Sequence, residues 1–208
     1  MGRKYLIKEI FHTLQGEGFW TGRPACFVRF AGCNLWSGLE RDRARDSRRA
    51  PCAEWCDTDF AGGAKMSAEE ILEGVGRADM VVFTGGEPLL QLDQSLVSAL
   101  GGRYLALETN GTIPLGVAGL DWVACAPKCL DRMELARADE VKVMWPDLDP
   151  IEVRGRLGAD FASHWWISPV SRVGGIGDRD VFTRAASLCR TLPGFRLTLQ
   201  AHKVWGIR

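Results

Sequence analysis

The stretch Met80-Val81-Val82-Phe83-Thr84-Gly85-Gly86-Glu87-Pro88 begins as an apolar, partly β-branched run and ends in two glycines, a glutamate and a proline. A short apolar run that is bounded by turn residues predicts a buried strand. The glycines open the backbone just past this strand, and the carboxylate beside them is able to hold the ammonium group of a ligand. The stretch therefore predicts a strand whose C-terminal end contributes to a binding site.

The same pattern recurs along the chain on both sides of this stretch. Strands are predicted at residues 4–10, 25–31, 80–83, 104–107, 122–125, 140–145, 165–167 and 195–199, and polar, glycine or proline residues follow most of them. Helices are predicted at about residues 68–78, 89–100, 148–158 and 178–191. The first of these helices begins with the capping box Ser67-Ala68-Glu69-Glu70.

The alternation of strands and helices predicts an α/β fold. Residues just past the C-terminal ends of successive parallel strands converge in barrel-type folds, and binding sites lie there. Because too few helices are visible for a full barrel, we expect a partial, trimmed TIM-like barrel of about six strands and three to four helices, with the site at the C-terminal strand ends. A chain of 208 residues is long enough for one sizeable core, so residues 1–208 are expected to form a single domain.

The charge balance and the N-terminal sequence narrow the class of partner. Lysine plus arginine equals aspartate plus glutamate at 26 each, so no overall positive field favours nucleic acid or an anionic membrane. The N-terminal residues lack the apolar core of a signal peptide, and no run approaches the length of a membrane span. We therefore expect a cytoplasmic protein that acts on a small molecule.

Three of the seven cysteines, Cys33, Cys52 and Cys56, are grouped in one loop that follows the apolar run Phe27-Val28-Arg29-Phe30. In a reducing compartment, cysteines grouped in a loop indicate metal binding or catalysis before disulfides. Thiolate ligands select zinc or iron–sulfur clusters. The loop therefore predicts a metal centre.

The identity of that metal is open on the local sequence alone. A closed structural zinc site needs four ligands, and the fourth could come from Cys26, His12 or a distant cysteine. The strand end at Thr84 to Pro88, which is opened by glycines, has no use in a zinc ribbon. It favours an iron–sulfur cluster with one coordination position left for a ligand.

Some charged residues allow two interpretations. Glu17 lies in a turn between two glycines and is either a solvated loop charge or part of a pocket. Arg29 lies among apolar neighbours and is either paired at the sheet surface or directed into a pocket. The mixed-charge run Glu40 to Arg49 is typical of a solvated helix or loop, and it lacks the interleaved aromatic residues of a nucleic-acid surface.

Several segments together resemble a known family. Gly85-Gly86-Glu87-Pro88, placed after a cysteine-rich loop, is similar to the sequence signature of the radical S-adenosylmethionine enzymes. A narrower resemblance, to the 7-carboxy-7-deazaguanine synthase family, rests on the segments Leu14-Gln15-Gly16-Glu17-Gly18, Arg29-Phe30-Ala31-Gly32-Cys33-Asn34-Leu35-Trp36-Ser37-Gly38, Cys56-Asp57-Thr58-Asp59-Phe60, Glu108-Thr109-Asn110-Gly111 and Gln200-Ala201-His202-Lys203. This resemblance implies conversion of 6-carboxy-5,6,7,8-tetrahydropterin to 7-carboxy-7-deazaguanine with loss of ammonia, for queuosine and related deazapurines.

The resemblance also implies a set of cofactors and site residues. A catalytic [4Fe–4S] cluster would be held by Cys33, Cys52 and Cys56, and Mg²⁺ by Thr58. The residues that would hold S-adenosylmethionine are Asp57, Gly86, Glu87, Lys128 and Ser168. Those that would bind the pterin are Leu14, Gln15, Gly16, Glu17, Arg29, Thr84, Glu108, Asn110, His202 and Arg208. A homodimer and an electron donor such as a flavodoxin are the implied protein partners.

The sequence departs from the family pattern around these residues. Eighteen residues separate Cys33 from Cys52 and three separate Cys52 from Cys56, and both gaps are longer than in the family. A surface loop absorbs the first insertion easily, whereas the second changes how two thiolates meet neighbouring irons. Two alternative functions therefore stay open here, a glycyl-radical activating enzyme and a zinc-stabilised binding module without catalysis.

Overall fold

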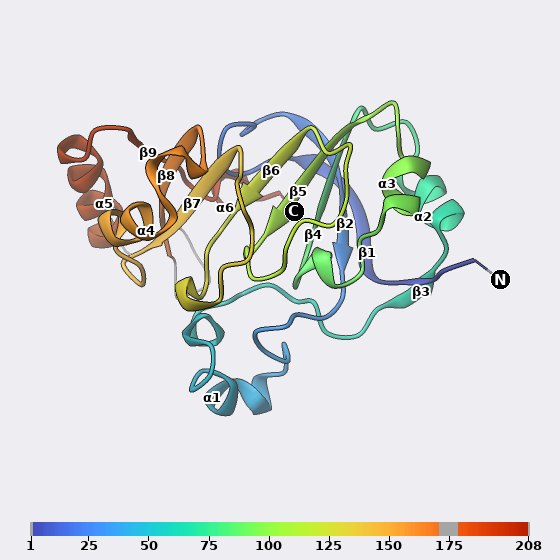
Figure 1. Ribbon diagram of the computed structural model, residues 1–208, viewed down its shortest axis with the longest axis horizontal. Helices are drawn as coiled ribbons and strands as arrows, with labels where there is room; N and C mark the ends of the chain where they lie inside the picture. Colours follow the sequence, from blue (N-terminus) through green and yellow to red (C-terminus); the bar gives the residue numbers. More distant parts are fainter. Residues whose placement is uncertain (1, 171–178, 208) are drawn as a thin grey trace.

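The computed structural model describes residues 2–170 and 179–207. These residues build one sheet with the strand order β3-β1-β2-β4-β5-β6-β7-β8-β9 (Figure 1). The strands are β1 (Tyr5–Leu14), β2 (Pro24–Phe30), β3 (Ala64–Met66), β4 (Met80–Gly85), β5 (Tyr104–Thr109), β6 (Trp122–Cys125), β7 (Glu140–Trp145), β8 (His164–Pro169) and β9 (Phe195–Leu197). β1 is antiparallel to β2 and β3, and all other neighbouring strands are parallel.

The expected α/β class is confirmed, but the strand count is wrong and the barrel is not confirmed. The described residues form nine strands rather than about six, and β3 and β9 are the two edges of the sheet. β3 has only three residues, of which two are exposed, so it carries no alternation that a sequence pattern could reveal. β1 extends past the expected residue 10 because its last residues pair with the start of β2, as Leu14 does with Pro24.

The helices of the described residues are α1 (Arg43–Asp46), α2 (Ala68–Val75), α3 (Gln94–Ala99), α4 (Pro150–Leu157), α5 (Arg179–Thr191) and α6 (Ala201–Trp205). The four helices α2 to α5 cover one face of the sheet (Figure 1). α2 and α3 lie toward one end of the sheet and α4 and α5 toward the other, whereas α1 lies apart from them in a loop beyond the strand ends (Figure 1). Of the six helices in the described ranges, α6 was not expected, because it is too short to show a helical period. α1 lies within the run Glu40 to Arg49, for which a helix or a loop was expected.

Two of the expected helices are shorter than their sequence patterns suggest. The capping box of α2 is present, since Ser67 Oγ accepts a bond from the Glu70 backbone N–H at 3.2 Å and Glu70 Oε2 accepts one from the Ser67 N–H at 2.6 Å. α2 ends at Val75 because Gly76 has a φ of 58°. The expected helix 89–100 is divided into a 3₁₀ turn, Pro88–Leu90, and α3.

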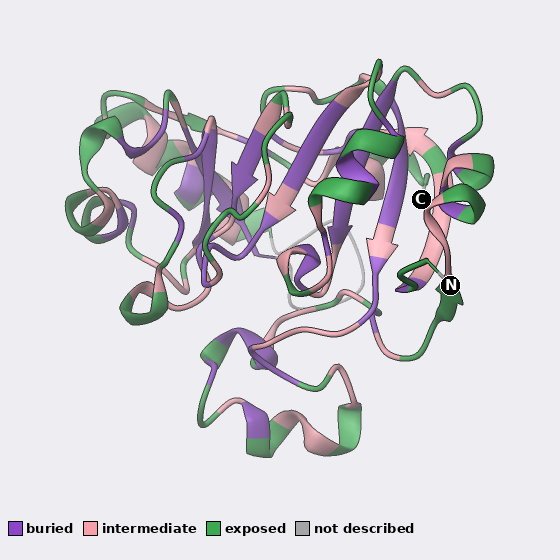
Figure 2. Ribbon diagram, turned by 45° about the vertical axis from the view of Figure 1, so that its right-hand side comes forward, coloured by how far each residue is buried: buried purple, intermediate pink, exposed green. Residues whose placement is uncertain are grey.

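Alternation along the strands separates a packed face from a polar face. Val81 and Phe83 of β4 and Leu105 and Leu107 of β5 belong to the large core beneath the helices. The residues between them point to the opposite face, because successive side chains of a strand alternate. In Figure 2 the strands are mostly buried and the helices expose their outer sides. No helix of the described residues combines the length and apolar character that a membrane crossing needs.

The turn between β1 and β2 crosses the polar face of the sheet and packs against it. Phe19 stacks against Trp122 of β6 with ring centroids 4.9 Å apart, and Trp20 meets Trp122 and Tyr104 edge-on. The backbone N–H of Gly18 donates to Thr198 Oγ1 at 2.8 Å. These contacts hold the turn across the sheet from β2 to β9, so that Glu17 lies above the middle strands.

Candidate active site

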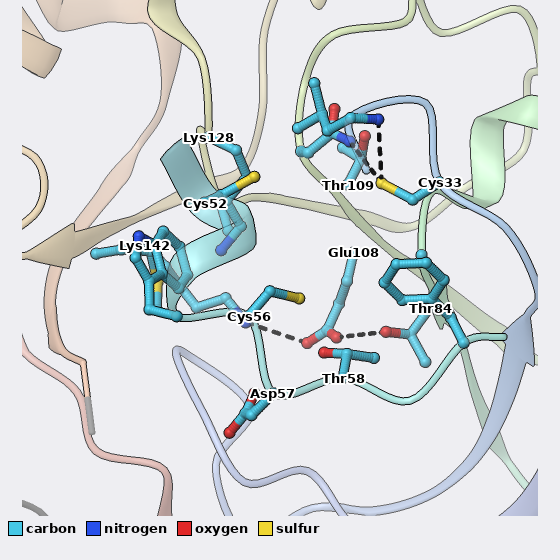
Figure 3. A pocket seen from close by; sticks show the side chains of 18 of the residues that line it. Cys33, Cys52, Cys56, Asp57, Thr58, Thr84, Glu108, Thr109, Lys128 and Lys142 are labelled. Carbon is cyan, nitrogen blue, oxygen red and sulfur yellow. Dashed lines mark hydrogen bonds and ion pairs between the residues drawn. The ribbon is translucent and has the colours of Figure 1, made fainter. Parts of the chain in front are cut away.

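Two adjoining cavities lie on the polar face, at the C-terminal strand ends. The cysteine cavity is lined by Cys33, Cys52 and Cys56 together with Gly85, Gly86 and Lys128 (Figure 3). The polar cavity is lined by Gln15, Arg29 and His202 with their neighbours. The residues that line both cavities are Glu17, Asp57, Thr58, Thr84, Glu108 and Gln200. A ligand in one cavity is therefore in reach of a ligand in the other.

The three cysteines enclose one space although their spacing is unusual. Cys33 follows β2, whereas Cys52 lies on a 3₁₀ turn, Pro51–Glu54, that leads to Cys56. The backbone N–H of Cys56 donates to the Cys52 carbonyl at 2.9 Å, which closes a helical turn between the two residues. In Figure 3 the three sulfur atoms border the same opening from different sides. The additional residue between Cys52 and Cys56 is thus taken up by this turn.

An arginine from the inserted segment secures that turn. Arg43 in α1 donates from Nη1 to the backbone carbonyl of Ala53 and, at 3.2 Å, to that of Cys56. Its guanidinium lies 4.7 Å from the centroid of the Trp36 ring. Because the residues after Cys33 form this helix, the longer gap before Cys52 supplies a support for the turn after it.

The donor set fits a cluster better than a single ion. Among the described residues, no three histidine, cysteine, aspartate or glutamate side chains converge on a position suited to one metal ion. A [4Fe–4S] cluster takes each thiolate on a different iron and therefore needs sulfurs that surround a wider space. Burial raises the pKa of Cys33, and it raises the pKa of Cys52 to about 12 in spite of the nearby Lys128. The thiols must lose these protons when metal binds.

The two glycines after β4 bring the cysteine loop onto the strand end. A Cβ atom at Gly85 would overlap the backbone of Phe30, and one at Gly86 would overlap the carbonyl of Gly32. The backbone N–H of Glu87 donates to that Gly32 carbonyl at 2.9 Å. Glycine is required because the backbones of β2 and β4 approach closely here. This approach places Cys33 beside Gly86.

Glu87 occupies a different place from the one expected of it. Its side chain is fully buried and does not line the cysteine cavity. Its carboxylate accepts bonds from Thr109 Oγ1 at 2.9 Å, from the Asn110 N–H at 2.8 Å and from the Leu89 N–H at 3.1 Å. Burial raises the pKa of this carboxyl against those three donors. Glu87 therefore connects the ends of β4 and β5, and its side chain lies outside the lining of the cysteine cavity.

Of the other residues expected to contact S-adenosylmethionine, some line the cysteine cavity and one does not. Lys128 lines the cysteine cavity, with Nζ 4.3 Å from the centroid of the Trp55 ring. Asp57 lines both cavities. Ser168 lies at the end of β8, fully buried, and its Oγ has no hydrogen-bond partner among the described residues. Its neighbour Val170, rather than Ser168, reaches the cavity wall.

Most of the residues expected at the pterin meet in the polar cavity. They are Leu14, Gln15, Gly16, Glu17, Arg29, Thr84, Glu108 and His202. Glu108 accepts a bond from Thr84 Oγ1 at 2.9 Å and a longer one from Gln15 Nε2 at 3.3 Å. Arg29 combines the two interpretations left open above, since it pairs with Glu9 at 2.9 Å and also lines the cavity.

Two expected pterin residues lie elsewhere. Asn110 lines the cysteine cavity, where its Nδ2 is 4.0 Å from Cys33 Sγ and 3.2 Å from Asn34 Oδ1. Its backbone is held there by Glu87, so the side chain is on the cluster side of the shared wall. Arg208 lies outside the described residues.

Lys142 in β7 is a site residue that the sequence analysis did not assign. Its Nζ lies 3.1 Å from Glu108 Oε1 and 3.2 Å from Glu17 Oε2, and it lines the cysteine cavity. The signal for it was present in the sequence, because alternation from the buried Val141 and Val143 directs Lys142 to the polar face. The pattern of a single strand does not show the role of Lys142, because its partners come from other elements.

The segment after β9 closes the polar cavity. The Ala201 N–H donates to the Gly16 carbonyl at 2.8 Å, and Gln200 Nε2 donates to Glu17 Oε1 at 3.0 Å. His202 lies so close to Gly16 that a Cβ atom there would overlap its ring. The C-terminal segment and the β1–β2 turn therefore form one wall.

A fold of this kind, with three cysteines gathered beside a glycine-opened strand end, defines a radical S-adenosylmethionine enzyme. The comparison with known proteins supports this class and narrows it. No family model matches the chain. The 7-carboxy-7-deazaguanine synthases of Nitratidesulfovibrio vulgaris and Bordetella pertussis are 39% and 41% identical to it, and each match covers 98% of this chain and 99% of the relative. The chain belongs to the 7-carboxy-7-deazaguanine synthase family.

A solved structure agrees with this assignment. The crystal structure of QueE from Escherichia coli has a TM-score of 0.71 and 26% sequence identity to the chain. The match covers 96% of this chain and 95% of that one. The similarity therefore extends over nearly the whole chain.

Proposed function

We propose that the protein converts 6-carboxy-5,6,7,8-tetrahydropterin to 7-carboxy-7-deazaguanine with loss of ammonia, a step toward queuosine and related deazapurines. Membership of the family supports this reaction. The observation that carries it is the wall of six residues that the cysteine cavity and the polar cavity share. A substrate ring in the polar cavity would lie beside the place where the radical arises.

The cysteine cavity is the place for the cofactors. Cys33, Cys52 and Cys56 would hold a [4Fe–4S] cluster, and the backbone at Gly86 with the side chain of Lys128 would contact S-adenosylmethionine. When bound, these two groups supply a carbon radical that takes a hydrogen atom from the substrate. The protein's own part is to keep this space apart from bulk water, which buried Leu35, Trp36 and Phe60 do along its lining.

The polar cavity suits a carboxylated pterin. The 2-aminopyrimidinone edge of a pterin presents N–H donors, and Glu17 and Glu108 are acceptors that face the cavity. Arg29 and His202 line the same cavity and provide the donors that the substrate carboxylate needs. One end of the substrate would thus meet hydrogen-bond acceptors and the other end would meet donors, which fixes its orientation.

A magnesium ion is proposed at Thr58. This residue lines both cavities, so its hydroxyl lies where the substrate and the radical source meet. Mg²⁺ retains several waters and binds through few protein oxygens plus those of a substrate, which suits a site with one hydroxyl and a substrate carboxylate. Its role would be to orient that carboxylate during ring contraction.

We also propose that the polar face curls as part of a barrel and that the chain is one domain. Lys142 of β7 reaches Glu108 of β5 at 3.1 Å although β6 lies between these two strands. Side chains meet across an intervening strand more readily when the sheet is concave on their side. One sheet connects Tyr5 to Leu197, which supports a single domain.

The protein partners and the compartment remain expectations of the family. An electron donor such as a flavodoxin is supported by the exposed Arg41, Arg48 and Arg49 on the cysteine loop, because an acidic donor is attracted by local positive charge. A homodimer follows from the family alone. All seven cysteines are free thiols, as in a protein kept in the reducing cytoplasm.

Anaerobic reconstitution tests the function. The reconstituted protein is incubated with S-adenosylmethionine, a chemical reductant and the carboxytetrahydropterin, and we expect both 5′-deoxyadenosine and the deazapurine. Formation of 5′-deoxyadenosine without deazapurine would show that the assigned substrate is wrong. The protein would then be a radical enzyme of another kind, such as a glycyl-radical activase. Zinc in place of iron and sulfide in the purified protein would instead indicate the binding module.

A further inference from the structure

Lys142 is a buried ammonium group among three carboxylates. Its side chain is 6% exposed, and its two ion-pair partners, Glu17 and Glu108, are 14% and 24% exposed. Glu140 lies on the same face of β7 and is 3% exposed. A lysine is seldom buried to this degree unless its charge is paired.

The three residues of the double ion pair come from different elements. Glu17 lies in the β1–β2 turn, Glu108 in β5 and Lys142 in β7. The turn is attached to β7 independently, because the Phe19 N–H donates to Glu140 Oε2 at 2.8 Å. Gly18 permits this approach, since a Cβ atom there would lie 2.5 Å from the same oxygen and φ is +71°. The backbone therefore fixes where Glu17 meets the ammonium.

The charges determine the protonation of the cavity. Burial by itself would lower the pKa of Lys142, but Glu108, Glu17 and Glu140 outweigh it and raise this pKa above its usual value. Burial by itself would raise the pKa of Glu108, but the Lys142 charge and bonds from Thr84, Lys142 and Gln15 lower it. Lys128 and Cys125 also interact electrostatically with Lys142. Without the ammonium, two carboxylates in one cavity would repel each other, and one would take up a proton.

We propose that Lys142 is a positioning residue that holds Glu17 and Glu108 at a fixed separation, as acceptors for the N–H edge of a fused heterocyclic substrate. Lys142 binds only one oxygen of each carboxylate, Glu17 Oε2 and Glu108 Oε1. Every carboxylate oxygen has two acceptor sites, so both groups retain capacity for a ligand. The inference rests on the proposed function for the identity of that substrate.

The test compares K142M and K142R in the reconstituted protein. One measurement is the binding of fluorescent 6-carboxypterin, which needs no turnover, and the other is kcat/KM for the tetrahydropterin against pH. For K142M we expect binding to weaken by at least about 30-fold, as when a buried charge pair loses one partner. We expect the acidic limb of kcat/KM to move to higher pH, because Glu108 without the ammonium protonates more easily. K142R, which retains the charge, should leave the limb near its wild-type position.

Other outcomes would overturn the proposal. A lysine with a merely structural role would lower the iron content and kcat of K142M at all pH values and leave the limb in place. Should K142M fail to fold, E108Q/K142M removes one charge of each sign and is compared with E108Q alone. Equal affinity for 6-carboxypterin in both proteins would contradict a role for Lys142 in holding Glu17. A wild-type protein that makes no deazapurine would count against the proposed function and not against these comparisons.

Discussion

Lys203 Nζ in α6 lies 2.5 Å from Asp57 Oδ2, the carboxylate of the residue that follows Cys56. The side chains are 29% and 55% exposed, so the pair is partly solvated. It connects the C-terminal helix to the cysteine loop at the wall that both cavities share. Its importance is therefore expected in ligand binding more than in stability.

The K203A variant tests that expectation. The free energy of unfolding should fall by no more than about 1 kcal/mol, as for other exposed ion pairs. The KM for the pterin should nevertheless rise several-fold, because Asp57 and α6 lose their fixed relation. K4A is the matched control, since Lys4 pairs with Glu70 at 2.9 Å far from the site. Equal kinetics in K203A and K4A would show that the pair has no part in the site.

A methyl group at Gly86 should disturb the cysteine cavity. In G86A the added Cβ overlaps the Gly32 carbonyl, so β2 and β4 must separate near Cys33. We expect a loss of about 1–3 kcal/mol of stability and less than the wild-type iron content after reconstitution. Anaerobic urea unfolding and iron analysis measure the two effects. G116A is the control, because a Cβ atom at Gly116 meets nothing within 4 Å.

Replacing Glu87 by glutamine should destabilise the strand ends. A glutamine has one acceptor oxygen for the donors that now surround two, so a buried N–H or hydroxyl loses its partner. The expected loss is about 1–3 kcal/mol. Since Glu87 does not line the cavity, the affinity of the folded E87Q protein for S-adenosylmethionine should stay within a few-fold of wild type. E54Q, at an exposed residue of the cysteine loop, is the control. A large loss of affinity for S-adenosylmethionine without a loss of stability would show that Glu87 contacts this ligand.

Removal of Arg43 should loosen the turn between Cys52 and Cys56. In R43A two backbone carbonyls lose their donor, and we expect fewer irons per chain and faster loss of the cluster to a chelator. R43K restores one donor and should recover part of the stability of the bound cluster. R48A removes an exposed arginine from the same loop and should keep the iron content and the rate of cluster loss of the wild type. If R43A retains the wild-type iron content, the hydrogen bond from the Cys56 N–H to the Cys52 carbonyl is sufficient to hold the turn.

The sequence was sufficient for features that depend on local patterns. The capping box of α2, the strand before Gly85 and the cysteine grouping were predicted because each is visible within a few neighbouring residues. β3 and α6 were missed because a segment of three or five residues shows no period. Their places are set by pairing with β1 and by contact with the β1–β2 turn.

The site was predictable in its residue types more than in its orientations. Glu87 was expected to face a ligand. The backbone at Gly85 and Gly86 lies close to the end of β2, and in this arrangement the Glu87 side chain faces Thr109 and Asn110. Lys142 was overlooked because its function depends on carboxylates that are distant in the sequence. Such relations follow from strand order and register, which local patterns do not contain.

The attachment of Gln200 to Glu17 and of Ala201 to Gly16 has a consequence for the order of synthesis. The three cysteines leave the ribosome before Gln200 and Ala201 do, because they stand earlier in the chain. Iron can therefore reach a nascent chain in which the substrate's binding place does not yet exist. A product that ends before Gln200 would carry the three cysteines without the segment that closes the polar cavity.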